Sequence, residues 1–178
     1  MRRENGTGKF WGHNEMTNHI HLVVVPATPA SLRRGIGDTH RRYTRAINFR
    51  EGWRGYLWQG RFASCLLDEP YVHAAVRYVE RNPVAARLVE CPEDYPWSSA
   101  RSHVTGADDP VLSPCFLTAQ IRDWAAYLAA AEDTMALRLE QHSRTGRPLG
   151  DDLFLQRLEQ HTGLRLQKQT PGRKPKKQ

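Results

Sequence analysis

Two histidines one residue apart are the first residues in this sequence whose types and spacing suggest chemistry. His19 and His21 stand at the start of the apolar run 22–25, which Pro26 closes. A β-branched run bounded by proline predicts a buried strand over about 19–25, and side chains on a strand alternate between its two faces. His19 and His21 should therefore point the same way, where two neutral imidazoles could hold one divalent cation. The alternative is that both are polar residues on the exposed face of a half-buried strand.

A tyrosine on a helix is the second candidate. Asp68 followed by Pro70 predicts a helix start, because aspartate caps the first turn and proline is tolerated within it. Tyr78 falls on an apolar stripe of this helix, seven residues after Tyr71. A phenol can act as a nucleophile. The helical pattern taken alone favours a core aromatic residue at this position.

An amide follows the tyrosine by one helical turn. Asn82 occupies this position and directly precedes Pro83. Because proline lacks an N–H group and disfavours a helical residue before it, we expect the helix to stop here. Asn82 would then cap a second helical segment over 84–89. Capping and a functional role are equally good explanations of Asn82.

A basic helix is predicted after the histidine strand. Apolar residues at helical spacing indicate a helix over 32–47 with Ser31 as its N-cap, one side of which packs on the sheet. Gly35 and Gly37 weaken its first turn by roughly 1 kcal/mol each, so the helix should begin later than its cap suggests. The other side carries five arginines: Arg33, Arg34, Arg41, Arg42 and Arg45. Such a face is most often solvated surface, but it also suits contact with phosphates.

A second strand is predicted over 56–67. On it Gln59 and Arg61 share one face, while Trp58 lies on the other. A guanidinium on a sheet face can clamp a phosphate in bidentate fashion, although an ordinary surface ion pair is the alternative for Arg61. Gln59 and Trp58 could contact exposed bases or could simply pack.

Composition bounds the class of protein. The chain has 178 residues and a formal net charge of +7. This length fits one domain with a hydrophobic core, and the charge favours a polyanionic partner, nucleic acid first. No apolar stretch is long enough to span a bilayer, and three widely spaced cysteines give neither a disulfide framework nor a zinc motif. We therefore expect a cytoplasmic protein with no membrane partner.

Four short motifs, in order and spacing, carry a family resemblance. They are MTNHIHLVVVP, LWQGRF, RYVERNPVAARLV and DYPWSSA. Together they resemble the HUH-type single-tyrosine transposases, specifically the REP-associated (IS200-like) branch, named for two histidines around a hydrophobic residue. The resemblance runs from Met16 to about Val104, with a weaker one over the segment RTGRPLGDDLFLQRLEQHTG.

The resemblance implies roles for these residues. His19 and His21 match the metal-binding histidines, Asn82 matches a further metal ligand, and Tyr78 matches the catalytic nucleophile. Members of the family bind Mg²⁺ or Mn²⁺ and cut single-stranded DNA at hairpin-forming palindromes, leaving a 5′-phosphotyrosine and a free 3′-hydroxyl. The implied function is DNA transposition in the bacterial cytoplasm, in association with the nucleoid. Family members include homodimers and monomers, so the resemblance leaves the oligomeric state open.

The resemblance also implies a fold and a domain organisation. The expected fold is α+β, a ferredoxin-like antiparallel sheet with helices on one face. Relatives carry a strand and a helix that this chain lacks ahead of its histidine strand. We expect an arm or truncated remnant over 1–15, a catalytic domain over 16–104, a helical extension over 105–164 and a disordered basic tail over 165–178.

Candidates for holding the DNA are the basic side chains near the site, Arg34, Arg41, Arg45 and Arg61, together with Gln59. Two other hypotheses stay open. A catalytically inactive, truncated protein could bind hairpin DNA without cutting it. A metal phosphodiesterase could use water as its nucleophile, with Tyr78 serving only the structure.

Overall fold

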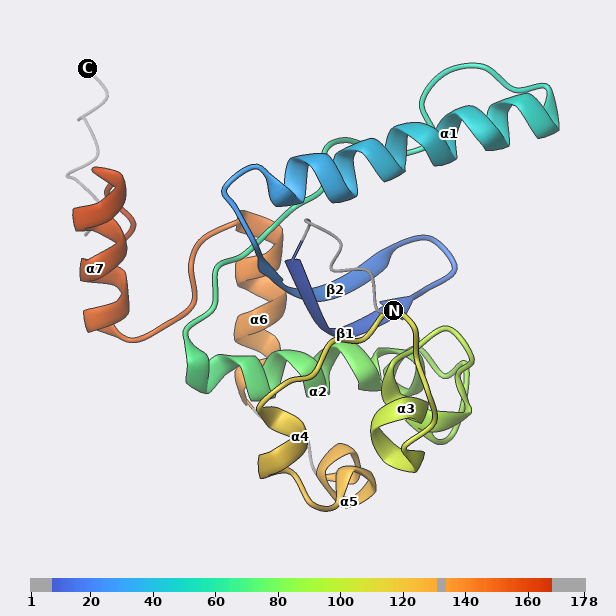
Figure 1. The fold of residues 1–178 in the computed structure, drawn as a ribbon. Coiled ribbons are helices and arrows are strands. Elements are labelled where there is room, and N and C mark those ends of the chain that lie inside the picture. The colour runs from blue at the N-terminus through green and yellow to red at the C-terminus, as the bar shows by residue number, and fades with distance from the viewer. Residues whose placement is uncertain (1–7, 131–133, 168–178) are drawn as a thin grey trace, which may run out of the picture.

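Two antiparallel strands and a larger set of helices form an α+β fold (Figure 1), which confirms the predicted class. The structure is a computed structural model that describes residues 8–130 and 134–167. The strands are β1 (Gly8–Glu15) and β2 (Ile20–Pro26). The helices are α1 (Asp38–Glu51), α2 (Glu69–Ala85), α3 (Ala100–Thr105), α4 (Leu117–Gln120), α5 (Trp124–Ala129), α6 (Thr134–Thr145) and α7 (Asp152–Thr162). Two short turns complete them, the π-helical η1 (Arg33–Gly37) and the 3₁₀-helical η2 (Pro92–Asp94).

The first strand corrects the prediction of an arm over 1–15. Residues 8–15 pair with β2 along its whole length, and the register shifts once, between Phe10 and Gly12. The buried positions of β1 are Gly12 and Asn14, which are small or polar. An apolar strand pattern is therefore missing, although Gly12 lies close against Val76 of α2. Residues 1–7 lie outside the described part of the chain.

Helix α2 packs on this hairpin as its sequence predicts. The side chain of Asp68 accepts a hydrogen bond from the backbone N–H of Glu69, and Pro70 lies in the first turn. The buried residues of α2 include Val72, Ala75, Val76 and Val79, which form a core with Val23 of β2. Helix α2, which carries Tyr78, thus packs on the face of β2 to which Val23 and His21 both belong.

The predicted break at Pro83 is wrong, because α2 continues through it to Ala85. Pro83 cannot donate to the carbonyl four residues earlier, which belongs to Val79. The Nδ2 of Asn14, a completely buried side chain of β1, donates to that carbonyl over 3.1 Å. A strand side chain therefore replaces the missing helical hydrogen bond, and Asn82 lies inside the helix rather than at a cap.

Helix α1 does not pack on the sheet as predicted. It begins at Asp38, after η1, which agrees with the expected late start. Ser31 does not cap it, because the Ser31 hydroxyl accepts instead from the backbone N–H of Thr28. No residue of α1 is buried, and the helix extends away from the strands and α2 (Figure 1).

The predicted strand over 56–67 is also wrong. Trp58 stacks on His40 of α1 with ring centroids 3.9 Å apart, so this stretch follows α1 instead of joining a sheet. Its end contacts the C-terminal half of the chain, where Leu67 forms an isolated bridge with Leu149. Within the described residues, 57–66 have no neighbouring strand to pair with.

Helices α4, α5 and α6 share one hydrophobic core with α2. Leu117, Trp124, Leu139 and Leu149 all pack in the same buried cluster as α2. Helix α6 continues to Thr145, and Leu149 in the segment that follows it is buried. The prediction of a disordered tail falls largely on 168–178, outside the described residues. No helix in the described ranges has the length and apolar character needed to cross a membrane.

Candidate active site

The two histidines meet at the start of β2. His21 lies within the strand and His19 one residue before it, where the hairpin turn is closed by a hydrogen bond from the backbone N–H of Met16 to the carbonyl of His19. Their Nε2 atoms are 3.1 Å apart. The Nδ1 of His19 lies 2.6 Å from the Oδ1 of Asn18, which sets the orientation of that ring. The predicted common face of the two imidazoles is therefore present.

This spacing suits two ligands of one cation. Two nitrogens each about 2.1 Å from an ion, at angles of roughly 90–109°, lie about 3.0–3.4 Å apart. Burial first, and the neighbouring His19 second, lower the pKa of His21 to about 4. Its ring is neutral at physiological pH, as metal coordination requires.

Asn82 is the third group at this point. Its Nδ2 lies 3.2 Å from the Nε2 of His21. The two ends of an amide are interchangeable by rotation about the last side-chain bond, so the Asn82 oxygen can occupy the same position. The described residues contain no group of three or more His, Cys, Asp or Glu side chains that could hold an ion. The amide oxygen is accordingly the donor that would complete a set with the two imidazoles.

Tyr78 reaches the same place from α2. Its ring meets the ring of His21 edge to face, with centroids 5.6 Å apart and an interplanar angle of 73°. The side chain is half-buried, and burial followed by the charge of Glu140 raises the pKa of Tyr78 above its ordinary value. Arg144 and a hydrogen bond with Asn82 act in the opposite direction. The phenol is therefore protonated at neutral pH, and its ring contacts His21 while also packing against the edge of the apolar core.

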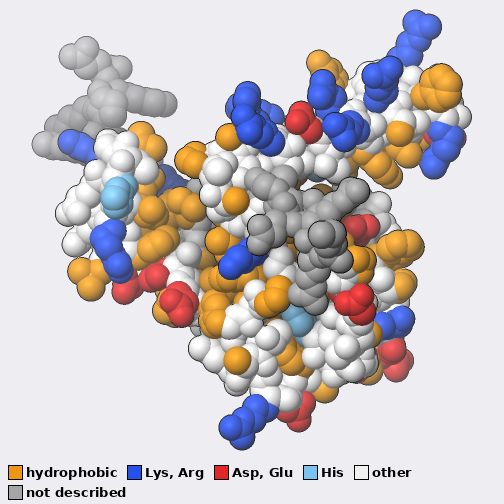
Figure 2. All heavy atoms as spheres, in the orientation of Figure 1, with side chains coloured by type: hydrophobic (Ala, Val, Ile, Leu, Met, Phe, Trp, Pro, Cys, Tyr) orange, Lys and Arg blue, Asp and Glu red, His pale blue; other side chains and the backbone are white. Residues whose placement is uncertain are grey.

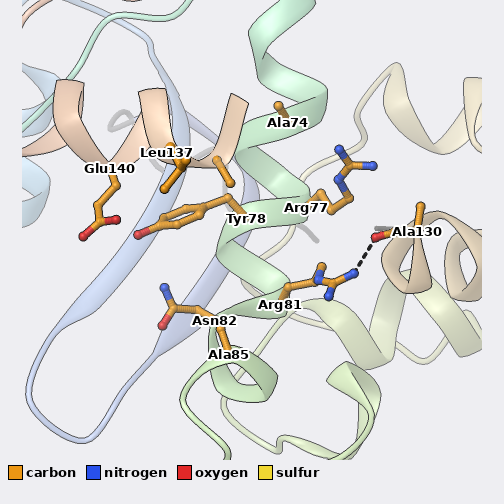
Figure 3. A pocket seen from close by; sticks show the side chains of 10 residues that line it. Ala74, Arg77, Tyr78, Arg81, Asn82, Ala85, Ala130, Leu137 and Glu140 are labelled. Carbon is orange, nitrogen blue, oxygen red and sulfur yellow. Dashed lines mark hydrogen bonds between the residues drawn. The ribbon is translucent and has the colours of Figure 1, made fainter. Parts of the chain in front are cut away.

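A cavity of about 260 Å³ opens on the other side of the tyrosine, between α2 and α6. Tyr78 and Asn82 line it together with Arg77, Arg81 and Glu140 (Figure 3). Arg81 also ties α2 to the end of α5, because its Nη1 donates to the carbonyls of two residues there, Leu128 and Ala130.

A buried network behind Tyr78 holds α2 in position. Glu80 is completely buried, and its Oε1 accepts hydrogen bonds from the Oγ of Ser99, over 2.5 Å, and from the Nδ1 of His103, over 2.6 Å. The backbone N–H of His13 on β1 donates to the same Ser99 Oγ over 3.0 Å. This network joins α2, β1 and the start of α3 within two residues of the tyrosine.

The predicted DNA-contacting residues lie elsewhere. Arg34 is on η1, Arg41 and Arg45 are on α1, and Gln59 and Arg61 follow α1, all exposed. The structure therefore brings together the predicted metal and nucleophile positions but not the predicted phosphate contacts.

The sequence analysis missed the groups that surround the tyrosine from the C-terminal half. Glu140 and Arg144 belong to α6, and an ion pair of 2.6 Å joins them. Their spacing of four residues on a helix predicts an ion pair between them. Nothing local to the sequence shows that this helix packs beside Tyr78.

Comparisons of the chain with protein-family models, with curated proteins and with solved structures give no match. The function proposed next is accordingly argued from the residues and their geometry.

Proposed function

We propose that this protein is a metal-dependent DNA strand transferase that cleaves and rejoins single-stranded, hairpin-forming DNA through Tyr78, as a transposase of the HUH type does. The observation that carries the proposal is the meeting of two imidazole nitrogens 3.1 Å apart with a phenol whose ring contacts one of them. A pair of histidines alone would fit many metal sites. A tyrosine on a rigid helix beside them adds a nucleophile.

His19, His21 and the Asn82 amide would hold Mg²⁺ or Mn²⁺, which when bound supplies Lewis-acid polarisation of the scissile phosphate. Burial keeps the ring of His21 uncharged, so that its lone pair stays available. The Asn82 side chain orients the Tyr78 hydroxyl by hydrogen bonding. The chain's own residues would thus hold the metal and position the nucleophile beside it.

The covalent step exchanges one phosphodiester for another. The Tyr78 oxygen attacks phosphorus and forms an O–P bond while the bond from phosphorus to the 3′ oxygen breaks. The phenolic proton passes to solvent, and the departing 3′ oxygen takes a proton to become a hydroxyl. Attack of a 3′-hydroxyl on the phosphotyrosine reverses the exchange, so rejoining needs no added energy source.

The test is a covalent adduct. The full chain is incubated with a labelled hairpin oligonucleotide and Mn²⁺, and the product is separated under denaturing conditions. We expect a labelled protein band that disappears with Tyr78→Phe and persists with Tyr71→Phe. Tyr71 is the matched control, because it lies seven residues earlier on the same helix.

Each other outcome rejects the proposal in a defined way. An adduct that persists in Tyr78→Phe removes Tyr78 from the nucleophilic role. Cleavage without an adduct indicates a phosphodiesterase that uses water. Hairpin binding that is unaffected by chelator and is not followed by cleavage indicates an inactive binding protein.

A further inference from the structure

Helix α1 and the turn that follows it form a basic, aromatic projection that the chemistry above does not use. We call residues 38–58 the α1 arm. Figures 1 and 2 show it extending from the body of the molecule, with blue Lys and Arg side chains along its upper side and apolar side chains toward its end. Because no residue of α1 is buried, the hydrophobic core does not account for its aromatic residues.

Three aromatic side chains near the end of the arm face solvent. Tyr56 is 100% exposed, Phe49 is 93% exposed and Trp53 is 59% exposed. Large apolar side chains that gather in solvent commonly mark a binding surface. Phe49 lies on the last turn of α1, and Trp53 and Tyr56 follow in a turn of defined geometry. The carbonyl of Asn48 accepts from the backbone N–H of Trp53, and the Nδ2 of Asn48 donates to the carbonyl of Gly55, each over 2.9 Å.

The charge of the arm selects a polyanion. It carries the five arginines Arg41, Arg42, Arg45, Arg50 and Arg54 against two acids, Asp38 and Glu51. Each acid already lies beside an arginine, Asp38 at 3.4 Å from Arg41 and Glu51 at 2.5 Å from Arg50. Across the described ranges, the other three arginines form no ion pair.

Arginines and aromatic rings alternate along this surface. Arg42, Arg45 and Phe49 have the spacing i, i+3, i+7 and so fall on one stripe of α1. Guanidinium groups bind phosphates, while aromatic rings stack on unpaired bases of any sequence. With 14 residues α1 is about 21 Å long, the span of roughly six stacked nucleotides.

We propose that the α1 arm binds an unpaired DNA strand, with its bases stacked on Phe49, Trp53 and Tyr56 and its phosphates held by the arginines. This inference rests on the proposed function, for which it supplies a site for the single strand that continues from the hairpin. Duplex DNA offers few exposed base faces for such rings. A second copy of the chain fits the α1 arm less well, because pairing two arms would bring the arginines of one copy against those of the other.

The test separates strand binding from cleavage. A fluorescent oligothymidylate of about 20 nucleotides, which forms no hairpin, is titrated by anisotropy with the full chain carrying Tyr78→Phe in chelator. The triple variant Phe49→Ala, Trp53→Ala, Tyr56→Ala should bind at least about tenfold more weakly, with an unchanged salt dependence. Trp97→Ala is the matched control, since Trp97 lies off the arm and is 61% exposed, and it should bind within about twofold of the parent.

A second variant separates stacking from simple exposure. Phe49→Tyr, Trp53→Phe, Tyr56→Phe keeps three rings and should retain the parent affinity. Unchanged strand affinity in the alanine variant overturns the proposal. If the alanine variant keeps its strand affinity but sediments as a monomer where the parent sediments as a dimer, the proposal is also overturned, and the α1 arm is assigned to contact between two copies of the chain. The strand-binding assay needs neither the metal nor the Tyr78 hydroxyl. A negative result in it would therefore reject the α1 arm as the strand site without deciding the outcome of the adduct experiment.

Discussion

Replacing Ser99 by alanine should destabilise the protein strongly although it removes a single oxygen atom. Ser99 and Glu80 are both completely buried. The Ser99 hydroxyl donates to the Glu80 carboxylate and accepts from the backbone N–H of His13, so it joins α2 to β1. The alanine variant leaves a carboxylate oxygen and a strand N–H each short of a partner where water has little access.

The magnitude follows from these two contacts. A hydrogen bond to a carboxylate contributes about 1.5–3 kcal/mol, and an unsatisfied backbone group costs about 1 kcal/mol more. We therefore expect Ser99→Ala to lower the free energy of unfolding by about 3 kcal/mol. At roughly 2–4 °C per kcal/mol for a chain of this size, Tm should fall by about 6–12 °C.

Urea unfolding at pH 7, followed by circular dichroism, measures the change. Ser102→Ala is the control, because Ser102 lies on the same helix, α3, and donates its hydroxyl proton only to the nearby carbonyl of Ala107. Its unfolding free energy should change by less than about 0.5 kcal/mol. An equal effect of the two variants would refute the coupling of α2 to β1 through Ser99.

Four further outcomes are expected. His21→Ala should weaken Mn²⁺ binding at least about 100-fold, as measured by electron paramagnetic resonance, and an unchanged affinity would exclude the histidine pair as the metal site. Because burial and Glu140 raise the pKa of Tyr78, the rate of adduct formation should climb with pH from 7 to about 9 without a plateau, and a flat profile would contradict a rate-limiting phenolate. Glu140→Gln should increase that rate severalfold at pH 7.5 in a single-turnover assay, whereas a slower variant would show that the carboxylate assists the reaction. Asp109→Ala should lower the free energy of unfolding by about 2 kcal/mol at pH 7. Burial acts to raise the pKa of Asp109, but the hydrogen bond from His13 and the other contacts lower it overall, so the parent loses this stability only as pH falls below the ordinary pKa range of aspartate. The difference in unfolding free energy between the two proteins should therefore narrow below about pH 4 in urea titrations.

The sequence was informative where short-range rules decide the geometry. Alternation on a strand places His19 and His21 together, and the cap at Asp68 with the apolar stripe places Tyr78 on a long helix. One turn of that helix then places Asn82 beside His21. The placement of the histidine pair and of Tyr78 on its helix depends on residues less than about 20 positions apart, whereas Asn82 and His21 are 61 positions apart and meet because α2 packs on the hairpin.

The errors arise where a distant partner decides the structure. The buried positions of β1 are Gly12 and Asn14, whose role in close packing and hydrogen bonding has no hydrophobic pattern. The segment 56–67 has strand-forming residues, but a strand also requires a neighbouring strand with a free edge. Helix α1 has an apolar side, yet amphipathic spacing does not say whether a sheet or a ligand lies against it.

The proline within α2 has a consequence for the alignment of the whole site. A regular helix presents no vacant carbonyl along its length, so a strand can slide against it without losing a specific partner. Pro83 leaves one acceptor exposed, at Val79, and the Asn14 amide from β1 meets it. The free carbonyl of Val79 therefore fixes the register of β1 against α2. Because β1 is paired with β2, the same register sets how far His21 lies from Tyr78.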